Sequence, residues 1–140
     1  MSSEQFGRSF LGFDFGTKRI GVAVGQTITG TASPLETLDA KQGVPDWKII
    51  HRLIQAWHPV GLVVGMPYNM DDTEAEITKL TKKFVQKLGK ETSLKVHVID
   101  ERLTSKAVKY ECERLGKKMK EKNDALAACL ILESFLENFE

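Results

Sequence analysis

The chain has 140 residues, of which 41% are hydrophobic and 28% are charged, and its formal net charge is +1 at pH 7. This composition is that of a folded globular protein and excludes wholesale disorder. The length fits one domain over residues 1–140, and the small net charge means that any nucleic-acid binding must come from a local basic patch.

Secretion and membrane insertion are not indicated by the sequence. The two cysteines, Cys112 and Cys129, lie in helix-like stretches without CxxC spacing, so we expect buried free thiols in a reducing compartment. The N-terminus lacks the apolar run of a signal peptide, and no segment approaches the roughly 18 apolar residues of a membrane span. We therefore expect a soluble cytoplasmic protein that does not contact a membrane.

The first predicted elements are three strands. Short apolar runs over residues 10–15 and 20–24 flank the polar turn 16–19 and predict a hairpin. A third strand is expected around residues 29–38, where Pro34 favours an edge or a bend over a central position. These three strands predict a β-meander.

A helix and a buried strand are expected next. Apolar side chains recur with helical spacing from Asp46 to Trp57, and His58-Pro59 ends the predicted helix. The continuous apolar run 61–65, bounded by glycines, is typical of a strand buried on both faces. This strand should be central in the sheet.

The next helix and strand are predicted from caps and periodicity. Thr73 is expected to cap a helix, with Glu76 three residues later, and Gly89 is expected to end it. Residues 94–99 predict a strand that ends in charged residues.

Two further helices complete the predicted order. They cover residues 104–115 and then run from Asn123 or Asp124 to about Phe135. The predicted order βββ-α-β-α-β-α-α, without internal repeats or linkers, indicates an α/β fold with one mixed sheet covered by helices.

Three carboxylates fall at the ends of predicted elements. Asp14 and Glu101 each end a strand-like run, and Asp124 begins a helix. The sheet would gather them at one edge, where their mutual repulsion favours a divalent metal with oxygen ligands. Mg²⁺, or Mn²⁺ in its place, fits this set and would support metal-assisted cleavage of phosphodiester bonds.

Each carboxylate also has an alternative interpretation. Asp14 would need a partner inside a strand, and Lys18 or Arg19 could supply the opposite charge. Glu101 could face solvent, and Asp124 could serve as a helix cap.

Phosphate-binding candidates lie beside these carboxylates. Gly16, Thr17 and Lys18 offer backbone amides, a hydroxyl and a cation next to Asp14, although a hairpin turn also requires glycine there. Arg102 could contact a phosphate or pair with a carboxylate. A basic stretch leads to Asp124 and is either a solvated face or a nucleic-acid contact; it includes Lys117, Lys118 and Lys120.

Four motifs in order make the chain resemble the YqgF/RuvX family of pre-16S rRNA nucleases, also described as Holliday-junction-resolvase-like proteins. The segments that carry the resemblance span essentially the whole chain: residues 13–25, residues 64–67 with Asn69, residues 100–104, and residues 124–128 with residues 131–133.

The resemblance implies an RNase H-like fold and a cytoplasmic nuclease that matures the 5′ end of pre-16S rRNA, acting on structured precursor rRNA or on a pre-ribosomal particle. The family's acidic triad carries over to Asp14, Glu101 and Asp124, and its loop motif makes Asn69 a substrate-binding candidate. This chain has Asp71-Asp72 where the family usually has a glycine after that asparagine.

Other functions are compatible with parts of the sequence. A resolvase of branched DNA would use the same chemistry but would need a homodimer with two sites, whereas the nuclease could be a monomer. The segment 14–18 also resembles the first phosphate loop of actin-like ATPases and sugar kinases, but 140 residues cannot supply their two lobes. A non-catalytic ribosome-assembly factor that binds RNA through the basic stretch is a further alternative.

Overall fold

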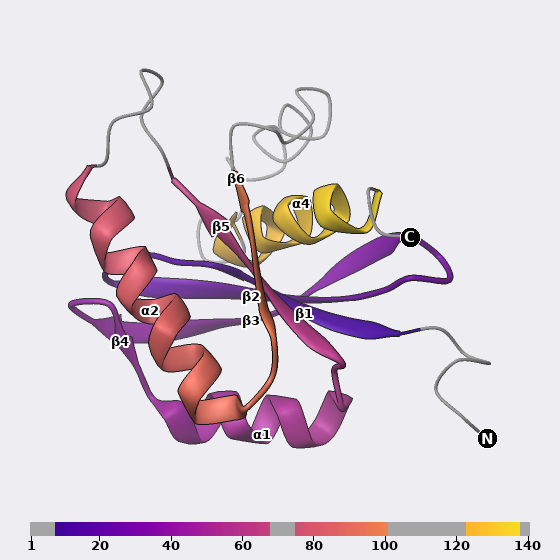
Figure 1. Cartoon of the computed structure of the whole chain (residues 1–140), viewed down its shortest axis with the longest axis horizontal. Coiled ribbons are helices and arrows are strands. Elements are labelled where there is room, and N and C mark those ends of the chain that lie inside the picture. Colours follow the sequence, from indigo (N-terminus) through magenta and orange to yellow (C-terminus); the bar gives the residue numbers. More distant parts are fainter. Residues whose placement is uncertain (1–7, 68–74, 101–122, 138–140) are drawn as a thin grey trace.

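The computed structural model describes residues 8–67, 75–100 and 123–137. In these ranges a mixed sheet of six strands carries helices on both faces (Figure 1). The strands are β1 (Ser9–Asp14), β2 (Arg19–Gln26), β3 (Thr31–Lys41), β4 (Val44–Pro45), β5 (Gly61–Met66) and β6 (Val96–Asp100). The helices are α1 (Trp47–Trp57), α2 (Glu76–Thr92) and α4 (Asn123–Glu137). The predicted α/β fold with a mixed sheet is confirmed.

The strand order across the sheet is β4-β3-β2-β1-β5-β6. β1, β2 and β3 form the predicted antiparallel meander, whereas β5 and β6 run parallel to β1. β5 lies between β1 and β6 with all six residues buried, which confirms the prediction of a central strand. A strand buried on both faces needs the continuous apolar sequence that β5 has.

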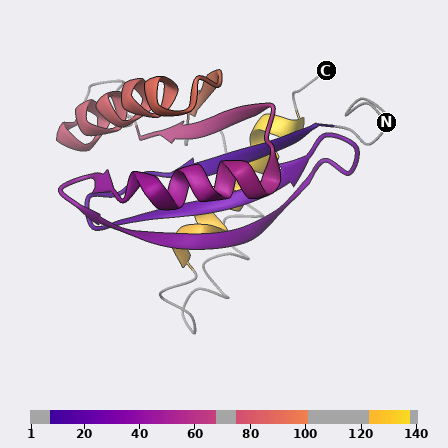
Figure 2. The same cartoon turned by 90° about the horizontal axis from the view of Figure 1, so that it is seen from below.

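Two apolar clusters lie on opposite faces of the sheet. Figure 2 shows α1 in front of the strands and α4 behind them. Leu11 and Phe13 of β1 pack with α1 and α2, whereas Phe10 packs with α4 on the other face. This division follows from the two-residue period of a strand. Cys129 of α4 is a buried free thiol, as predicted, and Cys112 lies outside the described residues.

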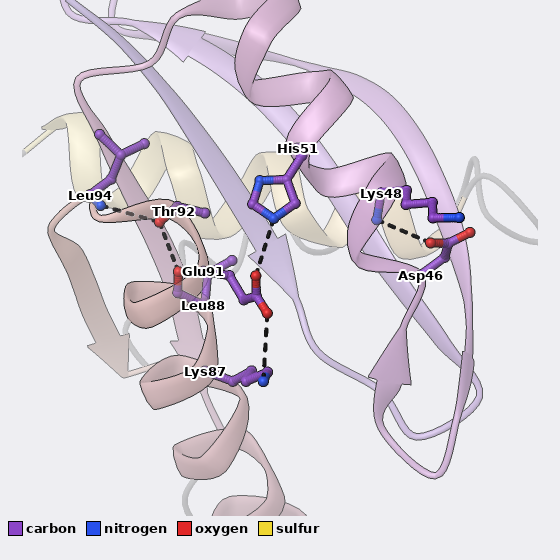
Figure 3. A network of polar contacts seen from close by, with 8 residues as sticks. All are labelled: Asp46, Lys48, His51, Lys87, Leu88, Glu91, Thr92 and Leu94. Atoms are coloured by element: carbon purple, nitrogen blue, oxygen red, sulfur yellow. Dashed lines mark hydrogen bonds and ion pairs between the residues drawn. The ribbon is translucent and has the colours of Figure 1, made fainter.

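Both ends of α1 agree with the prediction. The Asp46 carboxylate caps the helix by accepting a hydrogen bond from the Lys48 amide, with Oδ1 3.0 Å from N (Figure 3). His58 adopts a left-handed conformation with φ 47° and donates its N–H to the Ile54 carbonyl. Pro59 follows directly, so the helix cannot continue.

The predicted end of α2 at Gly89 is wrong, because the helix continues to Thr92. The Thr92 hydroxyl donates to the Leu88 carbonyl at 2.7 Å, and Ser93 takes the left-handed position with φ 59°. The extra turn also carries Glu91, whose carboxylate contacts His51 of α1 at 3.2 Å (Figure 3). That hydrogen bond from His51 lowers the pKa of Glu91. Contacts between the helices therefore outweigh the glycine's low helix propensity.

The third strand is longer than predicted and continues into a short hairpin. Gln42 and Gly43, with φ 52° and 82°, form the two-residue turn between β3 and β4. β4 was not predicted, because its two residues, Val44 and Pro45, are too few to show a strand pattern in the sequence. The predicted bend at Pro34 is confirmed by a bulge, because the register with β2 shifts between Val22 and Ala23.

The predicted helix cap Thr73 and the predicted helix 104–115 lie outside the described residues. α2 itself begins at Glu76, after Ala75 as N-cap. The Thr78 hydroxyl, fully buried, donates to the Pro67 carbonyl at 2.6 Å and accepts from the Ala75 amide at 3.3 Å. This side chain ties the start of α2 to the residue that follows β5. In the described ranges, no helix combines the length and the apolar character needed to cross a membrane.

Replacing Thr78 by valine should destabilise the protein by about 1–3 kcal/mol, because the Pro67 carbonyl and the Ala75 amide would lose their buried partner. Urea unfolding would measure the change. Thr81→Val is the matched control, because Thr81 is equally buried but, among the described residues, its hydroxyl donates to the Ile77 carbonyl one turn earlier in the same helix. Equal losses in the two variants would contradict this role of Thr78.

Candidate active site

The carboxyl ends of three strands meet at one edge of the sheet. β5 is parallel to β1 and β6 is parallel to β5, with Phe13 opposite Val64 and Met66 opposite Asp100. Asp14 ends β1 and Asp100 ends β6 at this edge. In open sheets with parallel strands, ligands bind at the carboxyl ends of the strands.

α4 approaches β1 and β2 closely because glycines leave the sheet without side chains there. A Cβ atom at Gly12 would lie 2.9 Å from the Leu132 Cβ, and a Cβ atom at Gly25 would come equally close to Leu136. At Gly21 an added Cβ would overlap the backbone carbonyl of Asp124. The first turn of α4 therefore lies directly on the sheet.

This contact brings two of the predicted carboxylates to the same place. Asp14 pairs in register with Gly21, and the Asp124 backbone lies on Gly21. Strand alternation puts Asp14 on the same face as Gly12, which is the face that α4 covers. Ala128 is fully buried with its carbonyl near Gly12, so a small residue of α4 permits the approach.

Asp124 forms an ion pair that was not predicted. Its Oδ2 atom accepts a hydrogen bond from Nε of Arg19 at 3.0 Å, and the two side chains are 28% and 51% exposed. An ion pair this exposed contributes at most about 1 kcal/mol to stability. The sequence had offered Arg19 as a partner of Asp14, but the structure pairs it with Asp124. The sequence signal for this ion pair was strand alternation, because it puts the side chain of Arg19 on the same face of the sheet as Gly21.

The turn between β1 and β2 is held by the β3–β4 hairpin. The Thr17 carbonyl accepts from the Gly43 amide at 2.9 Å, and the Lys18 carbonyl accepts from the Ala40 amide at 2.8 Å. A Cβ at Gly16 would lie 2.5 Å from the Arg19 carbonyl, so the tight turn itself requires glycine. Lys18 is exposed. The phosphate contacts expected of residues 16–18 stay predictions.

The remaining predicted site residues lie outside the described ranges. These residues are Glu101, Asn69, Arg102, Lys117, Lys118 and Lys120. Among the residues that are described, no group of three His, Cys, Asp or Glu side chains is arranged to hold a metal ion. The structure thus brings Asp14 and Asp124 to one place, and the third carboxylate stays a prediction.

Glu133, part of the last motif, has a structural role that the sequence analysis missed. Its Oε1 atom accepts a hydrogen bond from the Ala32 amide of β3 at 3.1 Å. This hydrogen bond joins α4 to β3, the third strand of the meander. A carboxylate among the buried residues Ile131 and Leu132 was the signal that could have revealed it.

A cavity of about 210 Å³ lies away from the carboxylates, on the face that α1 and α2 cover. Phe15, Trp47 and Phe84 contribute aromatic rings to its lining. The candidate active site is instead the open edge at Asp14 and Asp124, where charged groups gather.

Comparisons with solved structures support the predicted RNase H-like architecture. RuvC of T. thermophilus, solved in complex with a Holliday junction substrate, matches with a TM-score of 0.56 at 14% identity, over 93% of this chain and 95% of that chain. Fowlpox virus resolvase, in complex with Holliday junction DNA, matches with a TM-score of 0.54 at 11% identity, over 92% and 97% of the two chains. At these identities the likeness establishes the fold alone.

Sequence comparison identifies the family. A protein of Legionella pneumophila (strain Lens) named "Putative pre-16S rRNA nuclease" is 48% identical over 134 residues, which cover 94% of this chain and 96% of the relative. A protein of Actinobacillus pleuropneumoniae serotype 7 (strain AP76) with the same name is 50% identical over 133 residues, covering 93% and 97%. The family model of RuvX, described as Holliday junction resolvase, matches residues 8–138. The chain therefore belongs to the RuvX family.

Proposed function

We propose that this protein is a cytoplasmic nuclease that hydrolyses phosphodiester bonds in the precursor of 16S rRNA. The names of its relatives and its family support the reaction class. The observation that carries the proposal is the placement of Asp124 on Gly21, the strand partner of Asp14, at the edge where the parallel strands end. Two carboxylates at this edge would provide two ligands of a metal site for phosphodiester cleavage.

The chemistry of these side chains fits a divalent cation. Mg²⁺ takes one or two protein carboxylates and completes its shell with water and substrate phosphate, and Mn²⁺ accepts similar oxygen ligands. Asp14 and Asp124 would hold the ion, together with Glu101, which follows Asp100 in the chain. When bound, the ion would supply an activated water and stabilise the leaving oxygen.

The protein's own residues would position the substrate. The buried side chains around Asp14, including Phe13 and Phe15, give the carboxylate a rigid support. Lys18 and the basic residues Arg102, Lys117, Lys118 and Lys120 would neutralise phosphates along the strand, with Asn69, Gly16 and Thr17 as polar contacts. A rigid site matters because a displacement of about 1 Å can reduce the rate about 10²-fold.

A second candidate function is the resolution of branched DNA. The family description and the fold shared with RuvC favour it. A junction has two-fold symmetry, so this activity would require two copies of the chain presenting two sites. RNA cleavage makes no such demand, and a monomer would suffice.

Substituting Asp14 or Asp124 by asparagine should reduce cleavage of a labelled precursor-rRNA 5′ leader by at least about 10²-fold, because either change removes a charged metal ligand. Cleavage would be followed with Mg²⁺ or Mn²⁺, beside a four-way DNA junction. Asp46→Asn is the matched control, because asparagine also caps a helix and Asp46 lies at α1, on the far face from α4.

The outcomes separate the candidate functions. Cleavage of the RNA, lost in both site variants and retained in the control, would support the nuclease. Cleavage of the junction alone would favour the resolvase. Binding of RNA without cleavage, unchanged in the site variants, would contradict the nuclease and favour an assembly factor.

Gly21→Ala should reduce nuclease activity by about 10²-fold or more, because the added Cβ would displace the backbone of Asp124 while leaving both carboxylates in the sequence. Gly89→Ala is the control, since a Cβ there would meet only Val96, at 3.8 Å, and should stabilise α2 by about 0.5–1 kcal/mol. Activity and urea unfolding would be measured together. Full activity in Gly21→Ala would show that the close approach of α4 is not required.

A further inference from the structure

We propose that Arg19 is a substrate-binding residue: its guanidinium, held in place by Asp124, receives a backbone phosphate of the nucleic acid. The inference rests on the proposed function, because it assigns a phosphate contact beside the same two carboxylates.

Strand alternation carries the Arg19 side chain to the face of α4. Arg19 begins β2, and Gly21 and Ala23 follow on the same face, where α4 packs. Ile20 and Val22 point into the apolar cluster on the other face. The side chain of Arg19 therefore lies at the start of α4, beside the candidate active site.

The contact with Asp124 uses only part of the guanidinium. Nε donates to Oδ2 of Asp124 at 3.0 Å, and in the described part of the chain the two terminal nitrogens meet no further partner. The side chain is 51% exposed. The planar group is thus fixed at one side and open to a solute at the other, which suits the paired oxygens of a phosphate.

The surroundings of Arg19 are acidic, so a nucleic-acid strand needs a cation there. Asp14 and Asp124 both lie next to Gly21 on the α4 face, and the exposed Asp39 is the register partner of Arg19 on β3. A phosphodiester approaching these carboxylates would be repelled unless cations compensate their charge, and Arg19 would add its charge to that of a bound metal ion. Lys18 is also close in the chain, but no ion pair within the described residues fixes its amine. Among the described cations at this edge, Arg19 is the one that an ion pair holds in position.

Binding of a labelled single-stranded oligoribonucleotide would test this role. Fluorescence anisotropy would be measured with Mg²⁺ over a range of KCl concentrations, in an Asp14→Asn background in which cleavage should be at least about 10²-fold slower. Arg19→Gln should weaken binding about tenfold and reduce the slope of log K against log[salt] by about 0.7, the value for one phosphate of a single strand.

Arg52→Gln provides the matched control. Arg52 forms a comparable exposed ion pair, with Nη2 3.3 Å from the Glu36 carboxylate, but it belongs to α1 on the opposite face. The substitution removes the same charge, and it should leave both the affinity and the salt slope unchanged. Arg19→Lys should keep the salt slope but recover only part of the affinity, because an ammonium lacks the planar pair of donors.

Three results would overturn the inference: an unchanged salt slope in Arg19→Gln, unchanged affinity, or equal losses in Arg19→Gln and Arg52→Gln. An unchanged salt slope would show that the substitution acts on the structure and removes no phosphate contact. Equal losses in the two variants would show a general effect of net charge. Cleavage of the RNA by Asp14→Asn at the rate of the unsubstituted protein would instead contradict the proposed function, so the two failures are distinguishable.

Discussion

The close packing of α4 on a strip of sheet without side chains is the constraint on which the site depends. Gly12, Gly21 and Gly25 leave room for the helix, whose first turn lies on Gly21 and whose Leu132 and Leu136 reach Gly12 and Gly25. Leu132 and the neighbouring apolar residues hold the helix there through burial, while the Glu133 contact to β3 fixes its direction. The position of Asp124 follows from this packing and not from any interaction of its own carboxylate.

The electrostatics of the site follow from the same geometry. The backbone positions Asp14 and Asp124 at one edge of the sheet, so the repulsion between their like charges needs compensation. Arg19 supplies a positive charge to one of them through a partly exposed ion pair. This contact joins Nε of Arg19 to Oδ2 of Asp124, so the other carboxylate oxygen would be left for a metal ion and the terminal guanidinium nitrogens for a phosphate.

Much of the fold could be predicted from the sequence because its signals are local. The apolar run of β5 and the caps of α1 depend on neighbouring residues, and both predictions were confirmed. The last turn of α2 carries a contact between Glu91 and His51, forty residues apart, and β4 follows the two-residue turn at Gln42 and Gly43. The pairing of Arg19 with Asp124 crosses 105 residues and depends on the packing of α4 on β2, which local sequence signals do not give.

A crystal structure of the protein soaked with Mn²⁺, with anomalous scattering data, tests the central claim most directly. We expect a Mn²⁺ peak bound by carboxylate oxygens of both Asp14 and Asp124, at the edge where α4 lies on Gly21. A peak that one of these carboxylates does not reach, or an empty edge at Mn²⁺ concentrations that support cleavage, would contradict the account.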